Sequence, residues 1–243
     1  MSTTETIKKA QAALSRGDLS GARSILGTVI DQNPADFEGR YTMAVLHRTT
    51  GEHSLAKKVL AELLAEKPDF GRGFQELGYC ELALNRDPDA QLAFEKAVEL
   101  DASLLDSWRF LSALYQRQKD PRAEHAERQI AFLNELPPEL RTVISYLAAN
   151  RLADAERLCR FFMKQNQTHI EGMRLMAEVA TRTGVFDDAE FLLETVVELE
   201  PEHMDADIQL VHVLLRRQRF QKAYQRASSL YRSHGETVQQ VLA

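Results

Sequence analysis

The residue types that support enzyme chemistry are present in this chain, but their spacing matches no catalytic or metal-binding pattern. The seven histidines form no His-Glu-x-x-His pair, and Cys80 and Cys159 stand far apart, without a Cys-x-x-Cys motif. Gly71 and Gly73 lack the third glycine of a phosphate-binding loop, and they follow a predicted helix where that loop follows a strand. We therefore expect no catalytic residue, no metal site and no cofactor within residues 1–243.

A small residue recurs along the chain at nearly constant intervals, and this spacing indicates repeated helical hairpins. Seven alanines follow one another at intervals of 34, 34, 36, 29, 34 and 34 positions: Ala22, Ala56, Ala90, Ala126, Ala155, Ala189 and Ala223. Such a period, with helical hydrophobic spacing inside each unit, is typical of stacked helix-turn-helix units that cannot bury their apolar faces alone. We expect an all-α chain, an α-α superhelix of about seven helix-turn-helix repeats, with each alanine where two helices cross closely.

A second pattern precedes each turn and is clearest in Trp108-x-x-Leu111-Ser112-x-x-Tyr115. Together with the spaced alanines and the prolines that follow the second helices, it resembles the tetratricopeptide repeat, a pair of antiparallel helices. The resemblance covers essentially the whole chain. It divides the chain into seven units: 3–36, 37–70, 71–104, 105–138, 139–169, 170–203 and 204–237.

The repeat period breaks once, around the paired prolines Pro137 and Pro138. The interval from Ala90 to Ala155 is three positions short of two full repeats. Because paired prolines cannot lie inside a helix, we expect a boundary between a first block of four repeats (1–136) and a second (137–243). The second block holds about three repeats and the start of a further helix. Continuous stacking with a variant loop is the alternative.

The resemblance implies a concave groove lined by the first helix of each pair. By register with the family, the groove residues are Tyr41, Arg48, Arg72, Gln75, Tyr79, Arg109, Gln116, Arg174, Glu178, Arg182, His212 and Arg216. Arginine dominates this set although the formal net charge of the chain is −6. Since guanidinium groups bind carboxylates bidentately, the groove implies a protein or peptide ligand, which we expect to be acidic. The alternative is that these arginines lie on solvated faces and pair with Glu76, Asp106 or Glu178.

A narrower resemblance covers about a third of the chain. Residues 155–162, 169–177, 187–194 and 213–220 look similar to the repeat region that precedes the catalytic domain in bacterial tetratricopeptide-repeat sulfotransferases. This resemblance implies that residues 1–243 are the non-catalytic recognition or dimerisation region of a larger sulfotransferase-type protein, with catalysis in a downstream domain.

The last residues suggest a helix that begins without being completed. Val238, Val241 and Leu242 start an apolar face that a solenoid end would cover with a polar capping helix. Truncation of a longer polypeptide explains this pattern. The alternative is a stand-alone structural adaptor that self-associates, for instance as a homodimer, through its C-terminal repeat.

Composition sets further bounds. Of the 243 residues, 44% are hydrophobic and 27% are charged, as in folded proteins. No apolar run approaches the ~20 residues that cross a bilayer, and the N-terminus carries no apolar signal core. We therefore expect a cytoplasmic protein without a membrane partner. The negative net charge, with no basic run longer than Arg216-Arg217, argues against a nucleic-acid partner.

Overall fold

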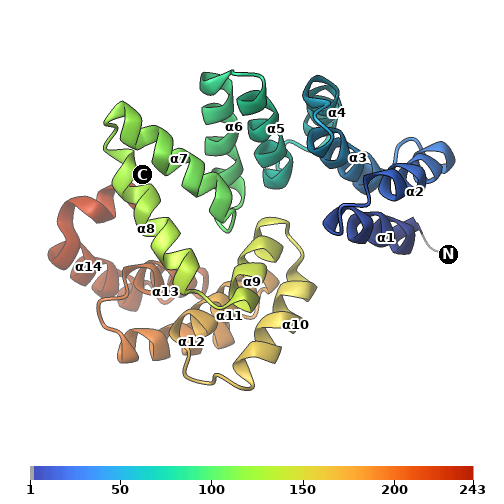
Figure 1. Cartoon of the computed structure of the whole chain (residues 1–243). Coiled ribbons are helices and arrows are strands. Elements are labelled where there is room, and N and C mark those ends of the chain that lie inside the picture. Colours follow the sequence, from blue (N-terminus) through green and yellow to red (C-terminus); the bar gives the residue numbers. More distant parts are fainter. Residues whose placement is uncertain (1–2, 243) are drawn as a thin grey trace. The chain divides into compact units, whose positions relative to one another are not determined.

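The structure of the chain, a computed structural model, consists of helices joined by short turns (Figure 1). It describes residues 3–242, and the side chains of residues 3–232. Within these residues there are fourteen helices and no strand, which confirms the prediction of an all-α chain. The predicted apolar face of Val238, Val241 and Leu242 lies outside the residues whose side chains are described.

Backbone contacts divide the chain into two compact units, which we call unit 1 (Met1–Glu135) and unit 2 (Leu136–Ala243). The helices of unit 1 are α1 (Thr3–Ser15), α2 (Leu19–Gln32), α3 (Phe37–Thr49), α4 (His53–Glu66), α5 (Gly71–Ala83), α6 (Asp87–Leu100), α7 (Leu105–Gln118) and α8 (Arg122–Glu135). The helices of unit 2 are α9 (Pro138–Ala148), α10 (Leu152–Met163), α11 (Ile170–Thr183), α12 (Phe186–Leu199), α13 (Met204–Arg216) and α14 (Phe220–Leu242).

The turn inside each hairpin contains one residue in the left-handed backbone region, and these residues recur with the repeat period. They are separated by 34, 34, 34, 31, 34 and 34 positions: Gly17, Gly51, Asn85, Lys119, Asn150, Gly184 and Gln218. Glycine adopts this conformation freely and asparagine more readily than other residues, whereas Lys119 and Gln218 adopt it at some cost. Seven equivalent turns confirm the expected number of about seven helix-turn-helix repeats.

The seven recurrent alanines lie on the second helix of each hairpin, and all are buried, with exposed fractions of 2% or less. Gly78, on the first helix α5, likewise allows a close approach between α5 and α6. A Cβ atom at Gly78 would lie 2.7 Å from the ring of Phe94 on α6. Small residues therefore allow the two helices of a hairpin to approach closely, as the alanine spacing predicts.

The one short interval between turns falls at α9. This helix has 11 residues, where the other first helices of hairpins have 13 or 14. Pro137 is the N-cap residue of α9, and Pro138 is its first residue, where a missing N–H breaks no helical hydrogen bond. The irregularity at the paired prolines is thus a shortened first helix that begins at Pro138.

A buried carboxylate connects successive repeats in unit 2. Glu190 on α12 is 3% exposed. It forms ion pairs with Arg217 and with Arg219, the latter at 2.7 Å, from the residues that follow α13. Lys222 on α14 lies 3.8 Å from the same carboxylate. The basic residues near 216–222 are therefore largely engaged within the fold.

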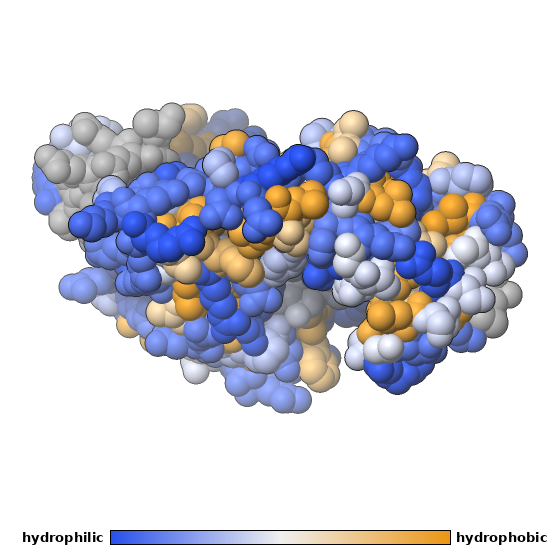
Figure 2. Space-filling view, turned by 45° about the horizontal axis from the view of Figure 1, so that its top comes forward, coloured by the Kyte–Doolittle hydropathy of each residue, from blue (hydrophilic) through white to orange (hydrophobic). Residues whose placement is uncertain are grey.

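The surface of the molecule is mixed in character. Figure 2 shows hydrophilic residues over most of the visible face, with hydrophobic residues in separate small patches. Within the described residues, no helix is both long enough and apolar enough to cross a membrane.

Candidate functional site

The first helices of the second and third repeats bring three polar side chains together in unit 1. Nε of Arg48 on α3 donates to Oε2 of Glu76 on α5 at 2.5 Å, and the guanidinium group lies over the ring of Tyr79, 5.0 Å from its centroid. Burial raises the pKa of the Glu76 carboxyl in spite of the attraction of Arg48. Burial also raises the pKa of Tyr79 to about 12, and the charges of Asp106 and Glu76 add to this effect.

Three aromatic rings extend from this cluster towards α7. The ring of Tyr79 lies edge-on to those of Phe94 and Phe110, with centroid distances of 5.4 and 5.5 Å. Phe94 and Phe110 stack on each other, with centroids 5.0 Å apart. The absence of a side chain at Gly78 leaves the space that the Phe94 ring occupies. The sequence thus positions a surface aromatic, Phe110, on a ring that belongs to the core.

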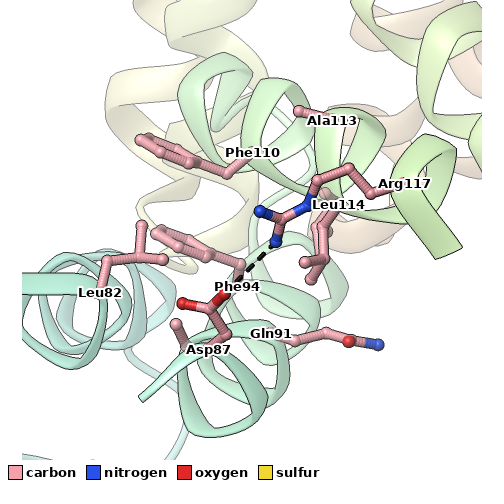
Figure 3. Close-up of a pocket in the computed structure, with 10 residues that line it drawn as sticks. Leu82, Asp87, Gln91, Phe94, Phe110, Ala113, Leu114 and Arg117 are labelled. Carbon is pink, nitrogen blue, oxygen red and sulfur yellow. Dashed lines mark hydrogen bonds and ion pairs between the residues drawn. The ribbon is translucent and has the colours of Figure 1, made fainter. Parts of the chain in front are cut away.

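A cavity of about 250 Å³ opens beside this stack, between α5, α6 and α7. We call it the α5–α7 pocket, and its lining residues are Leu82, Asp87, Ala90, Gln91, Phe94, Phe110, Leu111, Ala113, Leu114 and Arg117. The lining is mostly apolar. Figure 3 shows the rings of Phe94 and Phe110 on one side of the pocket and the side chain of Arg117 reaching across towards Asp87.

The polar groups of the α5–α7 pocket come from one ion pair and from the amide of Gln91. Nη2 of Arg117 lies 3.3 Å from Oδ2 of Asp87, and both side chains are more than half exposed. Exposed ion pairs of this kind contribute little to stability, so a ligand can compete for either group. The pocket can therefore accept an apolar side chain and offer both a donor and an acceptor next to it.

The remaining predicted groove residues of unit 1 make their own contacts. Tyr41 on α3 packs edge-on against Phe70, with ring centroids 4.9 Å apart, and its burial raises its pKa. Gln75 donates to the hydroxyl of Ser107 at 3.0 Å, and Gln116 donates to Glu127 at 2.5 Å.

The two other predicted arginines of unit 1 are Arg109 and Arg72. Arg109 pairs with Asp106 at 3.0 Å on its own helix. Arg72 is exposed on α5, and its charge acts on Tyr41.

The predicted groove residues of unit 2 divide into a paired group and an exposed group. On α11, Arg174 and Arg182 both approach Glu178, at 3.9 and 2.7 Å, and Arg182 also donates to the carbonyl oxygen of Leu147 on α9. His212 and Arg216 on α13 are exposed, and neither has an ion-pair partner among the residues whose side chains are described.

Arg174 belongs to a longer, partly buried network. It pairs with Glu171 at 2.8 Å, and Glu171 in turn accepts from His203 at 2.8 Å. Burial raises the pKa of Glu171, but the hydrogen bond with His203 and the charge of Arg174 outweigh it, so the net shift is downward. The hydrogen bond with Glu171 raises the pKa of His203. This network holds the start of α13 against α11.

Most of the predicted basic groove is therefore charge-compensated. Arg48 pairs with Glu76, Arg109 with Asp106, and Arg174 and Arg182 with Glu178. These carboxylates are the ones that the alternative interpretation of the sequence names. An acidic ligand would have to displace internal partners at these arginines.

Sequence reasoning did not identify the α5–α7 pocket, although register with the family places one of its lining residues, Ala113, in the groove. One signal was available, because Phe110 stands one repeat period after Glu76, which the structure places beside the predicted groove residues Arg48 and Tyr79. The same register places Phe110 beside the predicted groove, although Glu76 is buried and Phe110 is exposed. The sequence analysis assigns no role to Arg117.

The comparisons with known proteins agree with the repeat architecture. Residues 13–75 match the family model described as tetratricopeptide repeat. Over these residues the chain matches the tetratricopeptide repeat. The matched segment runs from the end of α1 to the start of α5, and the turn spacing continues the same repeat to α14. No curated protein matches the chain.

Several solved structures resemble the fold of this chain. They include Pseudomonas aeruginosa PilF (14% identity, 96% of this chain and 92% of that chain, TM-score 0.40). A tetratricopeptide repeat protein from Parabacteroides merdae also matches, with 14% identity over 97% of this chain and 95% of that chain and a TM-score of 0.46. PilW, a type IV pilus biogenesis factor, matches with 15% identity over 99% of this chain and 98% of that chain and a TM-score of 0.39. Likenesses at this level say nothing about the ligand.

Proposed function

We propose that this chain is a non-catalytic protein-binding scaffold that holds a peptide segment on unit 1, with one apolar side chain inserted in the α5–α7 pocket. The observation that carries the proposal is the pocket itself, with its apolar lining and the stacked pair of Phe94 and Phe110. Tetratricopeptide repeats are typical of protein-protein interaction and are generally non-catalytic.

The size of the pocket favours a side chain over a small molecule. Sites for drug-sized ligands measure roughly 300–1,000 Å³, whereas the α5–α7 pocket measures about 250 Å³. An aromatic or large aliphatic side chain would contact Phe110 and Leu114 and lose water from its surface on binding. The exposed groups of Arg117 and Asp87 are available for the peptide backbone beside it.

The expected acidity of the ligand receives less support from the geometry. Two of the three predicted groove arginines of unit 1 already have acidic partners, in the pairs Arg48–Glu76 and Arg109–Asp106. The apolar pocket is the better-formed feature. We therefore propose that apolar contact determines affinity and that acidic groups, where present, add steering.

A panel of blocked five-residue peptides tests this proposal. All have glycine at most positions: one has phenylalanine at the centre, one has alanine there, and one has three central aspartates. Binding is followed by NMR of ¹⁵N-labelled protein. The phenylalanine peptide should shift the amide signals of Leu82, Ala113 and Leu114, and the alanine peptide should not. Unchanged signals at millimolar phenylalanine peptide, or shifts only with the aspartate peptide near Arg72 and Arg109, would overturn the proposal.

The longer protein to which this scaffold would belong stays a prediction. We propose, on the narrower resemblance alone, that residues 1–243 belong to a sulfotransferase-type protein of the bacterial cytoplasm. The coding sequence downstream of residue 243 tests this directly. A catalytic domain in that sequence would support the idea, and a stop codon would end it.

A further inference from the structure

The ion pair of the α5–α7 pocket leaves hydrogen-bonding groups available to a ligand. Nη2 of Arg117 lies 3.3 Å from Oδ2 of Asp87. Because a guanidinium group has five N–H donors and a carboxylate has two oxygens, this one contact leaves both side chains able to bond further. The amide of Gln91 is engaged at both ends: Nε2 donates to Glu95 at 2.8 Å, and Oε1 accepts from Gln118 at 3.1 Å. A ligand in the pocket therefore meets a donor and an acceptor close together.

This ion pair lies across the pocket from the aromatic wall. Figure 3 shows the rings of Phe94 and Phe110 on one side of the pocket. On the other side the side chain of Arg117 reaches across towards Asp87 (Figure 3). A ligand ring that stacks along the aromatic wall, beside Leu114, can thus extend its far end to the ion pair. Since the rest of the lining is mostly apolar, a polar group on the ligand ring is favourable at that far end alone.

Few side chains combine an aromatic body with a polar end that matches an ion pair. Phenylalanine has no polar atom, and tryptophan carries an N–H that only donates. The tyrosine hydroxyl both donates and accepts, so it can bond to Asp87 and Arg117 at the same time. Buried tyrosine hydroxyls usually have such partners, and tyrosine is frequent among the residues that dominate binding energies.

Unit 1 already contains one tyrosine in an arrangement of this kind. Tyr115 on α7 is 4% exposed, and its hydroxyl donates to Oε1 of Glu95 on α6 at 2.8 Å. Nη1 of Arg122 donates to the same oxygen at 2.9 Å, and the guanidinium carbon lies 4.4 Å from the centroid of the Tyr115 ring. A tyrosine ring, a carboxylate of α6 and a guanidinium group therefore pack together here with their polar atoms bonded. Asp87 and Arg117 offer the same two polar groups to a ring from outside.

We infer that the side chain held in the α5–α7 pocket is a tyrosine, whose hydroxyl donates to Asp87 and accepts from Arg117. Since the pocket must first bind a peptide, this specificity rests on the proposed function. The two charged groups then bond to the inserted side chain in place of the peptide backbone. The ligand is a tyrosine-containing peptide segment of a partner protein.

Two blocked five-residue peptides, with either tyrosine or phenylalanine between glycines, test the inference. Their dissociation constants are measured from the amide signals of Leu82, Ala113 and Leu114 in ¹⁵N-labelled protein. Wild-type protein should bind the tyrosine peptide about fivefold more tightly, as expected for a net gain of hydrogen bonding. Equal affinities for the two peptides would overturn the inference and leave the proposed function standing. Absence of binding by either peptide would overturn both.

Two variants show whether the ion pair is responsible for the preference. Arg117→Met removes the guanidinium donors and keeps an unbranched apolar side chain, at a position that is more than half exposed. The ratio of the two peptide affinities should fall to about one. Arg128→Met is the matched control, because Arg128 is a similarly exposed, ion-paired arginine of unit 1 that does not line the pocket. Its ratio should equal that of the wild type. A ratio that persists in Arg117→Met, or that falls equally in Arg128→Met, would overturn the inference.

Discussion

The ring of Phe110 on α7 lies parallel to the ring of Phe94 on α6, with centroids 5.0 Å apart and an interplanar angle of 1°. Phe94 is 2% exposed, whereas Phe110 keeps 41% of its surface exposed. The pair thus joins the core of unit 1 to its surface. A ligand that touches Phe110 meets a side chain whose position the core fixes, which reduces the ordering that binding requires.

Gly78→Ala should destabilise unit 1. The new Cβ would lie 2.7 Å from the Phe94 ring, so the ring must move out of its place against α5. We expect the free energy of unfolding to fall by about 1–3 kcal/mol. Urea unfolding followed by the fluorescence of Trp108, the single tryptophan of the chain, measures it in unit 1. Gly27→Ala on α2 is the control, since a Cβ there meets open space. A Gly78→Ala protein as stable as the wild type would show that the close crossing is absent.

Ala126→Leu should overpack the crossing of α7 and α8. Ala126 is fully buried in the cluster that contains Trp108 and Leu111. We expect a loss of about 1–3 kcal/mol, seen as a lower unfolding midpoint by Trp108 fluorescence. Ala131→Leu, at an exposed position of the same helix, should leave the midpoint within about 0.5 kcal/mol. Equal midpoints for the two variants would mean that the repeat register in α8 is wrong.

Glu190→Gln should loosen the end of unit 2. The substitution removes the carboxylate that pairs with Arg217 and Arg219, and it leaves their charges without this partner. We expect the free energy of unfolding of unit 2 to fall by about 2 kcal/mol. Hydrogen exchange should become faster in α12, α13 and α14, while the fluorescence of Trp108 in unit 1 should stay unchanged. Glu198→Gln, exposed on α12, serves as the control. Identical exchange in both variants would contradict the role of Glu190.

The contribution of Glu52 to stability should depend on pH. Its hydrogen bonds, first with His47 and then with Arg23, lower its pKa from the ordinary value of 4.5 to about 2. Because the folded pKa is the lower one, the stabilisation is complete above pH 4.5 and is lost as the pH falls through 2. Glu52→Gln should therefore unfold at lower urea than the wild type near pH 6 and converge with it near pH 2.

The control for the pH series is Glu135→Gln, an exposed carboxylate of α8 without an ion-pair partner among the described residues. Trp108 fluorescence reports the midpoints in each case. A constant gap between the Glu52→Gln variant and the wild type from pH 6 to pH 2 would show that the Glu52 hydrogen bonds do not set its charge.

The repeat architecture could be predicted because it depends on short-range spacing. Turn residues such as Gly51 and Asn85 recur at the repeat period, and each buried alanine follows its turn within the same hairpin. Periodicity along the chain is enough to find both. The family resemblance then gave the order of first and second helices.

The partners of the charged residues could not be predicted in the same way. Arg48 and Glu76 lie in different repeats, and their pairing depends on how the two repeats stack. The sequence named Glu76 as a candidate partner but could not decide between pairing and ligand binding. His169 and His203 show the same limit: each accepts a backbone N–H through Nδ1 at the start of a first helix, a role that no histidine motif indicates.

The most direct test of the proposed peptide site is titration of wild-type protein and two variants with the phenylalanine-centred peptide. Phe110→Ala removes one wall of the α5–α7 pocket, and Leu92→Ala removes an exposed leucine of α6 that does not line it. We predict that Phe110→Ala weakens binding about tenfold or more, while Leu92→Ala binds as the wild type does. Equal affinities for all three proteins would contradict the account.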